Sequence, residues 1–98
     1  MTGQALLTNL TRADLDEIWA YTEARWGTDQ AAFYIRAMWR HIEAASGQPT
    51  LGRPCFDVRP GYRKIISGSH VVFCRPIDGG IEVVRILHGR MDFERHID

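Results

Sequence analysis

The stretch YRKIISGSHVVFCRPIDGGIEVVRILHGRMD, from Tyr62 to Asp92, decides the fold. Apolar and β-branched residues dominate three short runs within it, as is typical of β-strands. Two turns, Gly68-Ser69 and Asp78-Gly79-Gly80, separate the runs, because glycine takes positive φ angles without steric cost. Connections this short join antiparallel neighbours, so the stretch predicts a three-stranded meander over residues 62–67, 70–77 and 81–88.

The residues before the meander predict two helices. Apolar positions recur every three or four residues up to Gly27, which is suited to the left-handed conformation that ends a helix. Thr11 and Asp14 match a capping box at the start of this helix. Its stripe is Leu15, Ile18, Trp19, Thr22 and Trp26, and that of the second helix is Ala31, Ile35, Met38, Ile42 and Ala45. Because only one or two residues separate the helices, the sequence predicts an antiparallel helical hairpin. The hairpin needs the sheet to pack against its apolar faces.

The remaining segments are shorter. Ala5 to Asn9 predicts a strand that adds an edge to the meander, and the proline- and glycine-containing segment Gln48 to Phe56 predicts a loop. Asp57 to Pro60 is a candidate strand start, and Met91 to Ile97 a candidate helical turn. The expected fold is α+β: a short N-terminal strand, then a helical hairpin packed on a three- to four-stranded antiparallel sheet, all in one domain, residues 1–98.

Composition excludes several classes of protein. The formal net charge is zero, so no overall basic excess argues for nucleic-acid binding. No apolar run approaches the roughly 20 residues of a membrane-spanning helix, and no secretory signal is present. The two cysteines make no disulfide framework, and the four histidines lack ligand spacing. We therefore expect a cytoplasmic protein without a membrane partner, metal or cofactor.

Cationic residues gather on or beside the predicted sheet. They are Arg59, Arg63, Lys64, Arg75, Arg85, Arg90 and Arg95, accompanied by His70, His88 and His96. One interpretation is the solvated outer face of a half-covered sheet. The other is a basic surface that binds an acidic partner segment or nucleic acid. Side chains alternate across a strand, so the sequence does not assign the arginines to one face.

The order of motifs resembles the ParE toxins of the RelE/ParE superfamily. The matching pieces are DLDEIWAYTEARWG (Asp14 to Gly27), DQAAFYI (Asp29 to Ile35), LGRP (Leu51 to Pro54), VRPGYRKIISGSHVVFCR (Val58 to Arg75) and GIEVVRILHGRMDFERHI (Gly80 to Ile97). Together they cover about nine-tenths of the chain in the same order. The fold that this resemblance implies, a helical hairpin on an antiparallel sheet, is the one that periodicity predicts independently.

The resemblance implies the toxin of a type II toxin–antitoxin module. Such a toxin poisons DNA gyrase, halts replication and is neutralised by a ParD-like antitoxin, whose acidic and apolar C-terminal segment folds onto it. It is not an enzyme, and no sequence-specific nucleic-acid binding by the toxin alone is implied. The partner-binding residues that we predict are Trp26, Tyr34, Arg59, Arg63, Arg75, Arg85, His88 and Arg90. For Trp19 and Trp26 the alternative is plain core packing.

A second branch of the superfamily, which resembles RelE, cuts mRNA in the ribosome. RNA cleavage needs a base, an acid and a group that stabilises the phosphorane charge. Arg63, Arg90 and His96 could supply part of that set, although the strands lack the lysine pair of this branch. A ribosome-dependent endonuclease is therefore the alternative function, and an inactive toxin fold that only binds a partner is another.

Overall fold

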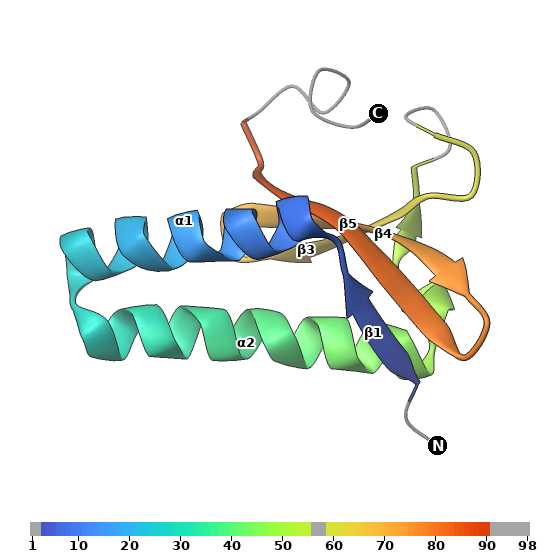
Figure 1. The fold of residues 1–98 in the computed structure, drawn as a ribbon, viewed down its shortest axis with the longest axis horizontal. Helices are drawn as coiled ribbons and strands as arrows, with labels where there is room; N and C mark the ends of the chain where they lie inside the picture. The colour runs from blue at the N-terminus through green and yellow to red at the C-terminus, as the bar shows by residue number, and fades with distance from the viewer. Residues whose placement is uncertain (1–2, 56–58, 91–98) are drawn as a thin grey trace.

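The computed structural model describes residues 3–55 and 59–90 and confirms the α+β fold with its helical hairpin. Its elements are β1 (Gln4–Leu7), α1 (Asn9–Trp26), α2 (Thr28–Gly47), a 3-10 turn η1 (Pro49–Leu51), β2 (Arg53–Pro54), β3 (Arg63–Ser67), β4 (His70–Ile77) and β5 (Gly80–His88). Gly27 separates the helices and has a φ of +94°, the positive value predicted for the end of α1. The helices lie side by side, and their linked ends project beyond the strands (Figure 1). The candidate helical turn at Met91 to Ile97 lies outside the described residues.

The sheet contains the predicted meander together with two edge strands. Strand order is β1-β5-β4-β3-β2, and the β3–β4 and β4–β5 pairs are antiparallel. The sheet differs from the expected antiparallel one because β1 pairs with β5 in parallel and because β2 pairs with β3. No tight turn joins β1 to β5, so the sequence does not fix their relative direction. β2 has only two residues, one of them proline, which is a loop signal.

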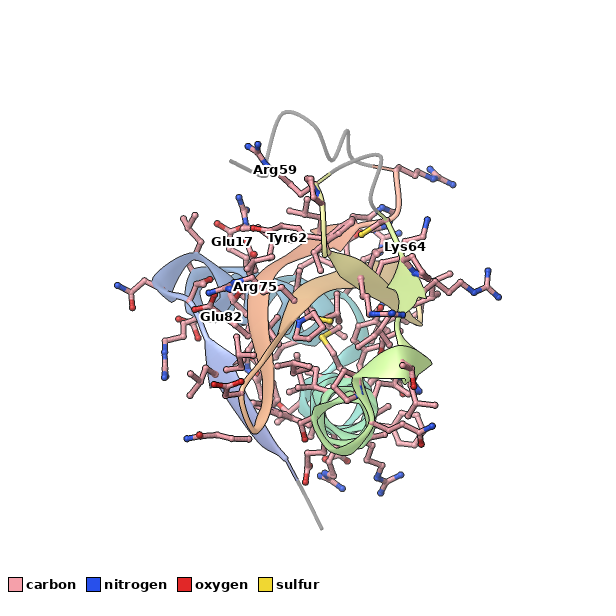
Figure 2. The ribbon with its side chains drawn as sticks, turned by 90° about the vertical axis from the view of Figure 1, so that its right-hand side faces the viewer. Glu17, Arg59, Tyr62, Lys64, Arg75 and Glu82 are labelled. Carbon is pink, nitrogen blue, oxygen red and sulfur yellow. The ribbon has the colours of Figure 1, made fainter. Side chains whose placement is uncertain are left out.

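The outer face of the sheet, turned away from the helices (Figure 2), is apolar at its centre. Phe73, Val71 and Leu87 are buried there beside Cys55, with Tyr62 and Val84 packed against them. Lys64, the register partner of Phe73, is only partly exposed. The central part of this face is therefore apolar and buried, so the interpretation as a solvated outer face is wrong there, whereas the interpretation as a basic surface stays a prediction.

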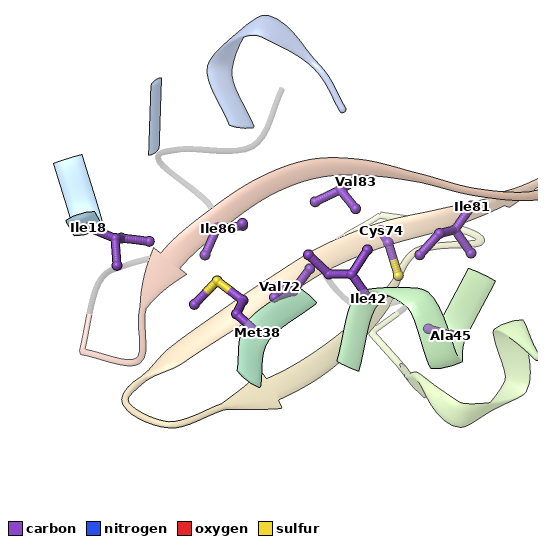
Figure 3. Close-up of a cluster of buried hydrophobic side chains, with 9 residues drawn as sticks. All are labelled: Ile18, Met38, Ile42, Ala45, Val72, Cys74, Ile81, Val83 and Ile86. Atoms are coloured by element: carbon purple, nitrogen blue, oxygen red, sulfur yellow. The ribbon is translucent and has the colours of Figure 1, made fainter. Parts of the chain in front are cut away.

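The main core lies between the helices and the opposite face of the sheet (Figure 3). It comprises Ile18, Met38, Ile42, Ala45, Val72, Cys74, Ile81, Val83 and Ile86. Met38 and Ile42 are fully buried, so the stripe predicted for α2 is confirmed at its centre. Burial, and secondarily the nearby Cys55, raises the pKa of the Cys74 thiol to about 11. Cys74 is therefore a buried, protonated thiol that serves as a small core residue.

The capping box predicted for α1 is wrong. Thr8 is the cap instead, because its Oγ1 accepts a hydrogen bond from the amide of Thr11 at 3.1 Å. Thr11 Oγ1 itself donates to the carbonyl of Val83 at 2.9 Å, and Asp14 Oδ2 accepts from the amide of Ile86 at 3.0 Å. Since β1 pairs with β5 only as far as Val83, these side chains of α1 bind the backbone of β5 where that pairing ends.

Candidate partner-binding groove

A groove runs between the second half of α1 and the adjoining ends of β4 and β5. Two neighbouring hollows form it, of about 500 Å³ and about 250 Å³, and they share Tyr21, His70 and His88. The larger hollow is also lined by Trp26 and Tyr34. We call this surface the hairpin groove; it is defined by Tyr21, Arg25, Trp26, Tyr34, His70 and His88. Aromatic and imidazole rings thus dominate its lining.

Tyr34 fixes the wall of the groove that α2 contributes. Its hydroxyl lies 2.7 Å from Nδ1 of His70, accepts from the amide of Ser69 at 2.9 Å and lies 3.3 Å from the carbonyl of Ser67. Gly68, with a φ of +58°, passes so close that an added Cβ would lie 2.6 Å from the Tyr34 ring. The hydroxyl of Tyr34 therefore binds its own chain, which leaves the ring as the surface that a partner could contact.

His70 and His88 form a pair across β4 and β5. They are register partners, and their ring centroids lie 5.4 Å apart with the planes at 81°. Nδ1 of His88 accepts a hydrogen bond from the amide of Arg90 at 3.2 Å. Burial, and then the proximity of His88, lowers the pKa of His70. The neutral form of His70 is therefore favoured at neutral pH.

The rim of the groove carries exposed aromatic rings. Trp26 and Tyr21 are 65% and 64% exposed, and the guanidinium of Arg25 lies 5.9 Å from the centroid of each ring. The alternative of core packing is thereby excluded for Trp26. Exposed aromatic side chains beside a groove mark an interaction surface more often than a passive one.

Arg63, Arg75 and Arg85 each bind a group within the described residues 3–55 and 59–90. Arg63 donates to the carbonyl of Gly52 at 2.7 Å, and Arg75 pairs with Glu82 at 2.8 Å on the outer face. Arg85 pairs with Asp14 beside β5. Of the predicted partner-binding residues, the structure brings together only Trp26, Tyr34 and His88; the side chains of Arg59 and Arg90 are exposed elsewhere.

Comparison with known proteins places the chain in a family. The family profile described as ParE toxin of type II toxin-antitoxin system, parDE, matches residues 5–93. The chain belongs to the ParE toxin family. It is therefore the toxin of a type II toxin–antitoxin system, as the resemblance of its motifs predicts.

Named relatives agree with this assignment. Toxin ParE1 of Mycobacterium tuberculosis is 46% identical in an alignment 98 positions long, which covers 99% of this chain and 100% of the relative. Toxin ParE1 of Caulobacter vibrioides is 44% identical over 91 residues, 93% of this chain and 94% of the relative. A solved structure titled "Chromosomal ParDE TA system from P. aeruginosa" has a TM-score of 0.75 at 18% identity, covering 88% of this chain and 95% of that chain. This last likeness supports the fold.

The residues expected for the RelE-type alternative do not form a described cluster. Arg63 is the first residue of β3. Arg90 follows Gly89, whose amide donates to the carbonyl of Ser69, two residues beyond the last residue of β3. Arg63 and Arg90 therefore lie near opposite ends of that strand. The remaining candidate, His96, lies outside the described residues. Membership of the ParE family agrees with the prediction that the chain is not an enzyme.

The predicted set omitted three residues of the groove. Tyr21 and Arg25 are four residues apart on α1, so they share a face of the helix, and this spacing was a usable signal. His70 was noted only as one of the cations near the sheet. Its place opposite His88 depends on a register shift between β4 and β5 at Phe73/Cys74, and no pattern in the sequence predicts that shift.

Proposed function

We propose that this chain inhibits DNA gyrase and so blocks replication, and that binding of a ParD-like antitoxin neutralises it. Its family and its near full-length relatives named as ParE toxins support this proposal. We further propose that it acts in the cytoplasm as one domain, residues 1–98. Within the part of the chain that the structure describes, no helix is long and apolar enough to cross a bilayer.

The hairpin groove is the surface that suits the antitoxin best, and its exposed Trp26 carries this proposal. Apolar side chains of an antitoxin segment would pack against Trp26, Tyr21 and the ring of Tyr34. An acidic side chain of the same segment would pair with Arg25 on the rim, which aligns the segment in the groove. Buried aromatic contacts would then supply most of the affinity.

The predicted cations take different roles in this scheme. Arg59 and Arg90 are exposed and can steer an acidic segment toward the toxin. Arg75 is exposed as well, but it is paired with Glu82. Arg63 and Arg85 bind groups of their own chain, so we assign them to holding the fold around the groove rather than to the contact itself.

Expression of the chain without antitoxin tests the toxic activity. Growth should stop with DNA damage signalling, and the purified chain should inhibit supercoiling by gyrase. Normal supercoiling with excess toxin would contradict the gyrase proposal. Site-specific mRNA ends on translating ribosomes, read by primer extension, would favour the RelE-type alternative. Unimpaired growth together with antitoxin binding would identify an inactive partner-binding fold.

Substitutions on the rim of the groove test whether the antitoxin binds there. Trp26→Ala combined with Tyr21→Ala should weaken antitoxin binding by roughly a hundredfold, because two aromatic anchors are lost. Leu10→Ala is the matched control, since Leu10 is an apolar residue of α1 that is 56% exposed and does not line the groove. If the double variant and Leu10→Ala bind the antitoxin with equal affinity, the antitoxin binds at another surface.

A further inference from the structure

We propose that the two ends of the hairpin groove carry opposite charges, and that the groove therefore accepts an antitoxin helix in which an acidic and a basic residue lie two turns apart. The inference rests on the proposed function and specifies the pattern of the segment that the same groove binds. It depends on two exposed side chains of α1, Arg25 at the larger hollow and Glu17 at the smaller one.

The side of α1 that faces the groove carries three residues at intervals of four: Glu17, Tyr21 and Arg25. Residues four apart are neighbours on a helix surface, so these side chains follow one another along α1. Tyr21 lines both hollows, whereas Glu17 lines only the smaller and Arg25 only the larger. Arg25 lies in the last turn of α1, at the end that projects beyond the strands (Figure 1). At the helical rise, the two charged residues are about 12 Å apart along the axis.

Both charges remain available to a partner. Among residues 3–55 and 59–90, neither Arg25 nor Glu17 takes part in an ion pair. Arg25 lies beside aromatic rings, a contact that leaves its charge in place. The other carboxylate at the smaller hollow belongs to Asp14, which Arg85 binds through two hydrogen bonds. The net negative charge of that end therefore comes from Glu17.

Rings and apolar side chains line the groove between its charged ends. Tyr21, His70 and His88 are shared by the two hollows, and Ile18 and Ile86 line the smaller one. Apart from the charged residues already named, no Lys, Arg, Asp or Glu of the described chain lines either hollow. An occupant is therefore met by rings along its length and by one charge of each sign at its ends.

An amphipathic helix matches this arrangement. Its positions i and i+7 lie on one face and about 10 Å apart along the axis, so two charges at this spacing reach both ends of the groove. The apolar residues between them then face the rings. The dipole of a helix favours an acidic residue toward the N-terminus and a basic one toward the C-terminus. A segment with the acidic residue first is therefore easier to order on binding, and it runs antiparallel to α1, from Arg25 to Glu17.

Charge reversals on the toxin test the polarity of the groove. The Kd for the antitoxin, the ribbon-helix-helix product of the neighbouring reading frame, is measured for Arg25→Glu and for Glu17→Lys. Each should weaken binding by roughly five- to thirtyfold, because an attraction becomes a repulsion. Higher salt should reduce both effects. Arg12→Glu and Glu43→Lys are the matched controls, since both residues are exposed on the helices outside the groove.

The result for Glu17→Lys is the sharper of the two. An antitoxin segment that is acidic overall would bind a more basic toxin more tightly, so only a basic residue seated at Glu17 explains a loss of affinity. Unchanged or tighter binding of Glu17→Lys would overturn the inference and leave the proposed function standing. A loss of the same size in Glu43→Lys would also overturn it.

Compensating changes in the antitoxin test the predicted pattern. Reversal of one acidic residue to Lys should restore binding to Arg25→Glu, and reversal of one basic residue to Glu should restore binding to Glu17→Lys. The rescuing acidic position should precede the basic one by about seven residues. Rescue with the basic position first, or at the spacing of about three or four residues that fits an extended segment, would overturn the inference. A wild-type chain that binds no antitoxin would overturn the proposed function as well.

Discussion

Arg85 donates two hydrogen bonds to Asp14, from Nε to Oδ2 and from Nη2 to Oδ1, each at 2.8 Å. The two side chains are 17% and 10% exposed. Asp14 Oδ2 also accepts from the amide of Ile86, so one carboxylate serves a guanidinium and the backbone of β5. A bidentate pair of this kind is strong and directional. It fastens α1, which forms one wall of the hairpin groove, to the sheet.

Removal of that carboxylate should destabilise the fold. Asp14→Ala removes the carboxylate that pairs with a largely buried guanidinium and accepts from a buried amide, so the free energy of unfolding should fall by about 3 kcal/mol. Urea denaturation measures the loss. Glu82→Ala is the control, because the Arg75–Glu82 pair is more exposed and should contribute less than about 1 kcal/mol. Similar losses in the two variants would show that Asp14–Arg85 is an ordinary surface pair.

A single methyl group at Gly68 should disturb the groove. Gly68→Ala meets the Tyr34 ring at 2.6 Å, in addition to the strain of its φ of +58°. Gly79→Ala carries a comparable strain at φ +80° but meets no atom within 4 Å. Backbone strain should cost about 1 kcal/mol in both variants, and overpacking should add about 1 to 3 kcal/mol at Gly68 alone. Thermal unfolding compares them, and equal midpoints would refute the role assigned to this contact.

The hydroxyl of Tyr34 should contribute to stability beyond the packing of its ring. Tyr34→Phe removes the acceptor of the Ser69 amide and the partner of His70, which should cost about 1 to 2 kcal/mol. Tyr21→Phe makes the same chemical change on a ring that is 64% exposed and should stay within about 0.5 kcal/mol of the wild type. Chemical denaturation distinguishes the two, and a neutral Tyr34→Phe would contradict the prediction.

His70 should make the stability of the free toxin depend on pH. The pKa of His70 is lowered by folding, chiefly through burial, so the unfolded chain takes up its proton first as the pH falls. The stabilisation from the neutral imidazole is complete above about pH 6.5 and is lost as the pH falls from there through the lowered pKa. Urea midpoints at pH 7.5, 6.5 and 5.5 should decline for the wild type and for His41→Asn. A decline of the same size in His70→Asn would assign the effect to other groups.

Much of the fold follows from local signals. The glycines of the two turns and the β-branched runs predict the meander, and the apolar repeat of α2 predicts the core residues Met38 and Ile42. These signals suffice because short turns leave few pairings to choose from. The partners of β1 and β2 are set by contacts between distant segments, which no local pattern encodes.

The groove follows from the sequence only in part. Trp26 continues the apolar repeat of α1, yet the helical hairpin extends past the strands at that end, so no sheet is left to cover it (Figure 1). The Thr11–Asp14 spacing fits a helix cap and a tie to a neighbouring strand equally well. Charge alone could not separate Arg85, which is used inside the fold, from Arg90, which is exposed.

The irregular step between Phe73 and Cys74 has a consequence for how this toxin could diversify. Near the turn, Ile77 pairs with Gly80, but beyond the step the pairing has moved by one residue, so His70 meets His88 rather than Leu87. Deletion of Val84 would remove the extra residue of β5 and leave His70 opposite His88, whereas insertion of one residue after Val84 would bring Leu87 opposite His70. One codon gained there would thus replace an imidazole of the cleft with leucine through a change of register alone.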